Sequence, residues 1–107
     1  MLLATANLAA AANTALYTVP ANRRAVFSLN LCNRSAAAVT VRVALTTGDA
    51  PTDADWIEYD TPLPAAGGSS GSVLERTGLA LAAGQKLYVR ASAVGVSASA
   101  FGIEDVA

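Results

Sequence analysis

The sequence contains no histidine and a single cysteine, Cys32. Histidine is the one side chain whose ordinary pKa lies near neutrality, so its absence excludes a histidine-based catalytic triad. A zinc site would also lack its usual nitrogen and sulfur ligands. A lone cysteine has no partner for a disulfide within the chain, which indicates synthesis in a reducing compartment, the cytoplasm.

Charge of either sign is scarce as well. Seven Lys and Arg residues stand against eight Asp and Glu residues, which gives a net charge of -1 at pH 7. Binding nucleic acid through its phosphates requires a basic excess, so neither DNA nor RNA is an expected partner. The uncharged first 22 residues lack the cationic start of a signal peptide, and polar residues and Pro20 leave no membrane-spanning run of about 18 apolar residues. No membrane contact is expected.

Large apolar side chains are few. The apolar residues make up 53% of the 107, but 25 of them are alanines, which contribute little volume to a core. A chain of this length forms one domain, and its small core predicts a marginal monomer that gains stability from neighbouring subunits. We expect residues 14–107 to form that domain and residues 1–13 to form an uncharged N-terminal arm, anchored on a neighbouring subunit by Leu2, Leu3 and Leu8.

Alternation with a period of two is the main structural signal. Ala25, Phe27, Leu29 and Leu31 share one face of a predicted strand, and the next strand alternates in the same way at Val39, Val41, Val43 and Leu45. The turn residues at 33–35 predict a hairpin between these two strands. Further strands are expected at 16–19, 56–60, 71–77, 79–81, 86–93 and 96–103. The pattern predicts an all-β fold, a single antiparallel β-sandwich or jelly roll of seven or eight short strands.

Three segments contain residue types that occur in functional sites. Asp49, Asp53 and Asp55 could offer oxygen ligands to calcium, but their spacing fits no EF-hand and favours a solvated loop. Alternation from residue 56 to residue 60 puts Trp56, Glu58 and Asp60 on one strand face, a pattern more typical of exposed charges than of a glycosidase pair. The glycine-rich run 67–71 lacks the Lys-Ser or Lys-Thr pair of a phosphate loop. No catalytic residue, metal or cofactor is therefore predicted.

Five stretches together resemble a known class of proteins: LYTVPA (16–21), LCNRS (31–35), YDTPL (59–63), LERTGL (74–79) and AGQKLYVRAS (83–92). Their order is similar to that in small β-sandwich structural proteins of tailed bacteriophage virions, and the likeness runs from about Leu16 to Glu104. These motifs are strand ends and turns, so the resemblance implies a fold and a structural role but no functional residues. It also implies a virion location after synthesis in the cytoplasm of a bacterial host.

The leading hypothesis is a non-enzymatic virion protein that decorates or cements the capsid or serves as an accessory part of the tail. Its expected partners are further copies of itself, with a trimer as one option, and the major capsid protein or other virion proteins. The alternative is a carbohydrate-binding or host-attachment module of a phage tail, with Trp56, Tyr59 and Tyr88 as a stacking platform.

Overall fold

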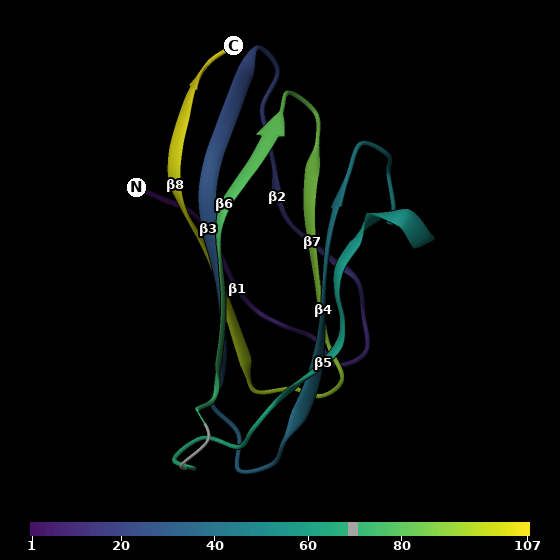
Figure 1. The fold of residues 1–107 in the computed structure, drawn as a ribbon, viewed down its shortest axis with the longest axis vertical. Coiled ribbons are helices and arrows are strands. Elements are labelled where there is room, and N and C mark those ends of the chain that lie inside the picture. Colours follow the sequence, from purple (N-terminus) through teal and green to yellow (C-terminus); the bar gives the residue numbers. More distant parts are fainter. Residues whose placement is uncertain (69–70) are drawn as a thin grey trace.

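The computed structural model describes residues 1–68 and 71–107, so part of the glycine-rich run 67–71 lies outside the described residues. The strands are β1 (Leu2–Asn7), β2 (Thr14–Thr18), β3 (Arg23–Asn33), β4 (Val39–Thr46), β5 (Trp56–Leu63), β6 (Val73–Ala82), β7 (Lys86–Ala91) and β8 (Val96–Val106). A short 3-10 helix, η1 (Asp53–Asp55), precedes β5. The strands run along a molecule with principal extents of 42 × 28 × 19 Å (Figure 1). In the part of the chain that the structure describes, no helix has the length and apolarity to cross a membrane.

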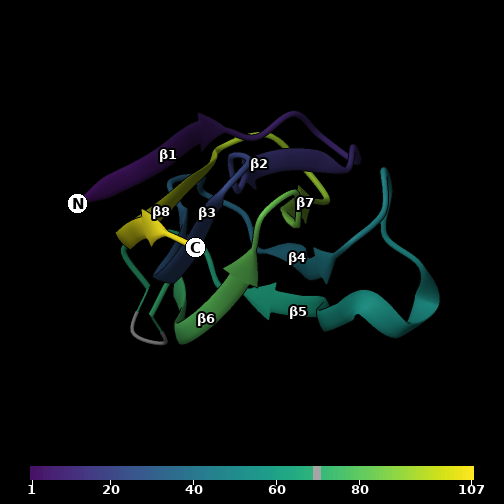
Figure 2. The ribbon, with the colours of Figure 1, turned by 90° about the horizontal axis from the view of Figure 1, so that it is seen from above.

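The strands pair like one long hairpin folded back on itself. β1 pairs with β8, β2 with β7, β3 with β6 and β4 with β5, and each pair is antiparallel. The additional pairs β3–β8 and β4–β7 join these into sheet A, with strand order β1-β8-β3-β6, and sheet B, with strand order β2-β7-β4-β5. Figure 2 shows the two sheets as facing layers. This is the topology of an eight-stranded jelly roll, and the predicted all-β sandwich is confirmed.

The core lies between the inner faces of the two sheets. Ala25, Phe27, Leu29 and Leu31 of β3 are buried there, as their alternation predicted. The facing core residues of sheet B include Val39, Val41, Val43, Leu87, Val89 and Ala91. Tyr17 of β2 reaches across from sheet B, packs edge-on against Phe27 at 5.6 Å between ring centroids, and donates its hydroxyl to Glu104 of β8 at 2.6 Å. Burial and this hydrogen bond raise the pKa of the Tyr17 hydroxyl far above its ordinary value.

The segment expected to form an N-terminal arm belongs to the sandwich. Residues 2–7 form β1, an edge strand of sheet A that pairs with β8 from Leu2 opposite Phe101 to Asn7 opposite Ser97. Leu8 then enters the core, is only 2% exposed, and donates its backbone N–H to the carbonyl of Val96 at 2.9 Å. The uncharged segment satisfies its backbone groups by adding a strand to the sheet.

The predicted hairpin between β3 and β4 is wrong, because the two strands lie in different sheets. Asn33, at the end of β3, is fully buried. Its side-chain amide donates to the backbone carbonyls of Ala37, Leu63 and Pro64, and its side-chain oxygen accepts from Ser35. These hydrogen bonds fix the chain where it crosses from sheet A to sheet B. Asn33, which the sequence indicates as a turn residue, therefore stabilises a crossover between the sheets.

The predicted segments 71–77 and 79–81 are joined in one strand, β6, which begins at Val73. The pairing of β6 with β3 slips between Phe27 and Leu29, where two residues of β6 lie opposite one of β3. Gly78 lies in this bulge with φ of 70°, a conformation open to glycine. The bulge interrupts the alternation, which is why the sequence pattern suggested two segments.

We predict that Asn33→Ala destabilises the fold by about 2–3 kcal/mol, because buried backbone carbonyls lose their donor. The free energy of unfolding in urea measures this. Asn30→Ala is the matched control, since Asn30 lies on the outer face of the same strand and is half-buried. Equal stability of the two variants would contradict the crossover role of Asn33.

Candidate functional site

The edge strand β5 contains two more residues than the segment of β4 that lies opposite it. Val41 pairs with Thr61 and Ala44 with Trp56, so the four residues from 41 to 44 lie opposite the six from 56 to 61. The register slips on both sides of Val43, and Asp60 has a φ of 52°. Two extra residues in a strand change which side chains share a face.

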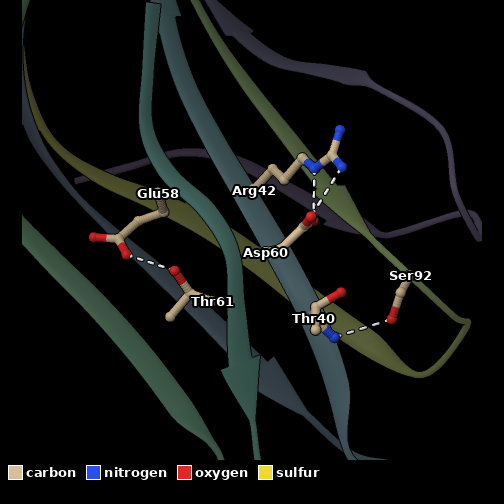
Figure 3. A network of polar contacts seen from close by, with 6 residues as sticks. All are labelled: Thr40, Arg42, Glu58, Asp60, Thr61 and Ser92. Carbon is tan, nitrogen blue, oxygen red and sulfur yellow. Dashed lines mark hydrogen bonds and ion pairs between the residues drawn. The ribbon is translucent and has the colours of Figure 1, made fainter.

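As a result, the prediction that Trp56, Glu58 and Asp60 share one face of the strand is wrong. Glu58 turns toward sheet A, where it forms an ion pair with Arg76 of β6 and accepts a hydrogen bond from the Thr61 hydroxyl at 2.8 Å. It thus links the edges of the two sheets and is held apart from Asp60, which pairs with Arg42 (Figure 3).

Trp56 and Tyr59, which strict alternation separates, are in contact. Their ring centroids are 5.7 Å apart with an interplanar angle of 72°, an edge-to-face arrangement. The guanidinium carbon of Arg42 lies 4.0 Å from the centroid of Tyr59 and 5.9 Å from that of Trp56. We call Trp56, Tyr59 and Arg42 the aromatic cluster.

Tyr88, the third residue of the predicted platform, lies on the same outer face of sheet B. Trp56 and Tyr88 both pair with Ala44, one on each side, and Ala44 is fully buried. The Tyr88 hydroxyl donates to the backbone carbonyl of Asp49. The three predicted aromatic residues therefore share one face, but only Trp56 and Tyr59 touch.

Arg42 is fixed by a two-pronged ion pair. Its Nε donates to Oδ1 of Asp60 at 2.7 Å and its Nη2 donates to Oδ2 at 3.0 Å. These hydrogen bonds lower the pKa of the Asp60 carboxyl, and the positive charges of Arg42 and Arg90 lower it further. Tyr59 on one side and Asp60 on another thus hold the Arg42 guanidinium in one orientation.

A shallow hollow of about 330 Å³ lies beside this pair on sheet B. Arg90 of β7 lies directly opposite Arg42 in the β4–β7 ladder, and both line the hollow. The remaining lining residues are Ala11, Thr40, Asp60 and Ser92. The Thr40 backbone N–H donates to the Ser92 hydroxyl at 2.9 Å, which fixes one rim (Figure 3).

This hollow was not predicted from the sequence. Its signal was present, because Arg42 and Arg90 occupy the outward positions of two alternating strands. That β4 and β7 are neighbours, however, is a property of the topology, and nothing in the sequence pairs the two strands.

Two of the three aspartates of the 46–55 loop contact other residues of the fold. Asp55 accepts hydrogen bonds from the backbone N–H and hydroxyl of Thr52 at 2.8 and 3.1 Å, and the first of these is the main cause of its lowered pKa. Asp49 lies 3.6 Å from Lys86. Within residues 1–68 and 71–107, no three His, Cys, Asp or Glu side chains gather as a metal site.

A second exposed feature is the apolar half of the outer face of sheet A. Val26 and Ile103 lie opposite each other on β3 and β8 and are 57% and 68% exposed. Phe101 and Leu2 lie opposite each other on β8 and β1. We call Leu2, Val26, Phe101 and Ile103 the apolar face. Of the predicted anchor leucines, Leu2 lies on it, Leu3 packs partly against the core, and Leu8 is buried.

Comparisons of the chain with protein-family models, with characterised proteins and with solved structures found no match. Two surfaces of the molecule therefore bear on its function: the apolar face on sheet A, and the aromatic cluster with its adjoining hollow on sheet B.

We predict that the Asp60→Asn variant loses less stability in acid than the unchanged chain does. A carboxyl whose pKa is lowered by folding stabilises the fold above its unfolded pKa of about 3.9, and this contribution is lost as the pH falls through the folded pKa. Thermal unfolding followed between about pH 7 and pH 2.5 should therefore show a smaller change for Asp60→Asn than for the unchanged chain. The control Asp53→Asn, at an exposed position in η1, should keep the full change; the same reduction in both variants would contradict the role of the ion pair.

Proposed function

We propose that this chain is a non-enzymatic structural protein of a bacteriophage virion, which assembles with copies of itself and attaches to a neighbouring virion protein. The resemblance of its strand ends and turns to such proteins motivates the virion context. The apolar face of sheet A is the observation that carries the proposal. Large exposed apolar side chains gathered on one surface mark a contact with another molecule.

The dimensions of the molecule suit such a contact. A standard interface buries about 800 Å² on each partner. A sandwich of 42 × 28 × 19 Å presents sheet faces of that order. The apolar face occupies one end of sheet A, and small polar residues such as Ser97, Ser99 and Asn30 cover the other end of β3 and β8. The contact is thus confined to part of the sheet, with polar groups next to it along β3 and β8.

Charge at the rim favours a second copy as the occupant. Arg24 and Asp105 lie opposite each other beside Val26 and Ile103, and these four residues line an apolar depression of about 310 Å³. Neither Arg24 nor Asp105 forms an ion pair within the described residues. A two-fold axis would place the Arg24 of each copy against the Asp105 of the other, since an isologous contact repeats every pair twice.

The ion pairs of the chain also favour a structural role. Asp60 and Glu58 are paired with Arg42 and Arg76, so these carboxylates are engaged in holding strands in place. On a symmetric particle, many copies add their modest individual contacts to a firm attachment. Affinity for the particle then depends on the number of copies as well as on the strength of each contact.

We predict that Ile103→Lys weakens self-association about tenfold or more, because the substitution brings two ammonium groups together across the two-fold axis. Val94→Lys is the matched control, since Val94 is 67% exposed, compared with 68% for Ile103, and lies outside the apolar face. Sedimentation velocity over a range of concentrations measures the effect. An unchanged chain that stays monomeric throughout, or equal weakening in both variants, would contradict the proposed contact.

The virion location has its own test. Particles purified from the bacterium that carries the gene should bind antibody to this chain, and electron microscopy of gold-labelled particles should show label at symmetric positions on the head or the tail. Particles that lack the chain altogether would contradict the virion role, whatever its oligomeric state.

The aromatic cluster favours a second candidate, a carbohydrate-binding or host-attachment module. Tyr59 is 59% exposed although Arg42 covers part of it, and Trp56 packs against it in an edge-to-face arrangement. Exposed aromatic rings bind the C–H faces of sugars, and their polar groups remain free for hydrogen bonds. Because the aromatic cluster and the apolar face lie on different sheets, this candidate is compatible with a structural role.

A further inference from the structure

The hollow beside the aromatic cluster holds an excess of positive charge. Arg42 and Arg90 face each other across the β4–β7 ladder, and like charges directly opposite each other are unfavourable. Asp60 is the one carboxylate among the residues that line the hollow, and its two oxygens are used by Arg42. One positive charge, that of Arg90, is left over.

The Arg90 guanidinium makes no hydrogen bond or ion pair with any residue in the described ranges. Arg90 is nevertheless half-buried, and its strand, β7, lies within sheet B between β2 and β4. A guanidinium presents paired N–H donors that match the two oxygens of a carboxylate. The hollow therefore offers a carboxylate a planar, two-pronged partner.

Hydroxyl groups lie along the same rim. The Ser92 hydroxyl oxygen already accepts the Thr40 N–H, so its own proton is available to donate to a ligand. The Thr40 side chain lines the hollow as well. Together they provide hydrogen-bonding groups of the kind that recognise the hydroxyls of a sugar ring.

The aromatic cluster borders this polar pocket. Tyr59 stacks on Arg42 at the edge of the hollow, and Asp60 and Tyr59 hold Arg42 in place before any ligand arrives. Preorganised groups lose little entropy on binding, which raises affinity. The volume of about 330 Å³ is at the lower end of the range of about 300–1,000 Å³ for small-molecule sites, which suits one sugar residue.

We propose that the hollow binds a carboxylate-bearing sugar residue of an acidic polysaccharide, with its carboxylate on Arg90, its hydroxyls on Thr40 and Ser92, and its ring beside Tyr59. This inference rests on the second candidate function, saccharide binding, and specifies the class of sugar and the residue that selects it. It is independent of the self-association through sheet A.

The test uses the full chain and two acidic probes, sodium D-glucuronate and sodium N-acetylneuraminate, in nuclear magnetic resonance titrations of the backbone amides. D-glucose is the neutral arm, and sodium acetate is the arm for a carboxylate without a sugar. We expect at least one acidic sugar to shift the amides of Thr40, Arg42, Arg90 and Ser92, with an affinity tenfold or more above that for glucose or acetate.

Arg90→Gln should lower the affinity for the acidic sugar at least tenfold. The matched control Arg23→Gln, at an exposed arginine at the start of β3 in sheet A, should leave it unchanged. The amide spectrum of each variant also reports whether it is folded. Arg90→Lys should restore only part of the affinity, because an ammonium lacks the paired donors.

Each contrary outcome is distinct. If glucose shifts the amides around Trp56 and Tyr59 as strongly as the acidic sugars do, saccharide binding stands and the acidic specificity is overturned. If acetate binds as tightly as the acidic sugars, the hollow is a simple anion site and the sugar assignment is overturned. If no sugar shifts any amide of sheet B, both this inference and the second candidate function are overturned, while the structural proposal is unaffected.

Discussion

The ladder between β3 and β8 is the interaction on which the rest of the molecule depends. It joins residues 23–33 to residues 96–106 without a register slip, and these are the two longest strands. The inner side chains of the ladder, such as Leu29 and Ala100, form one wall of the core, and its outer side chains, Val26 and Ile103, form the apolar face. β8 also carries β1 on its free side. Without this ladder, sheet A would lose both its core wall and the surface proposed for assembly.

The jelly roll separates the two proposed surfaces by its layered construction. The outer face of sheet A presents apolar side chains next to the pair Arg24 and Asp105, whereas the outer face of sheet B presents Arg42, Arg90 and their aromatic neighbours. Each surface uses outward positions, and the inward positions of the same strands fill the core. A copy bound to its neighbours through sheet A would therefore leave sheet B facing outward for a ligand, so the two proposed contacts do not compete for the same residues.

Most of the strands could be predicted from the sequence, and the predictions that were wrong share a physical cause. Strict alternation identified β3, β4 and β7 and grouped the core residues of β3 and β4 correctly on one face of each strand, because a regular strand buries every second side chain. The prediction was wrong where pairing partners decide the geometry. The crossover at Asn33 depends on carbonyls 30 residues further along the chain, and the contact between Trp56 and Tyr59 depends on two extra residues in β5 that are visible only against β4.

From the sequence alone the class of the molecule follows: one all-β domain that is low in charge, lacks histidine and has a small core. Those properties follow from composition and local periodicity, which each segment carries alone. Folding of the whole chain sets which residues face one another. It made β1 part of the sandwich, put Arg42 opposite Arg90, and gathered Leu2, Val26, Phe101 and Ile103 on one surface. These relations depend on backbone hydrogen bonds between distant segments, which form only when the whole chain closes on itself.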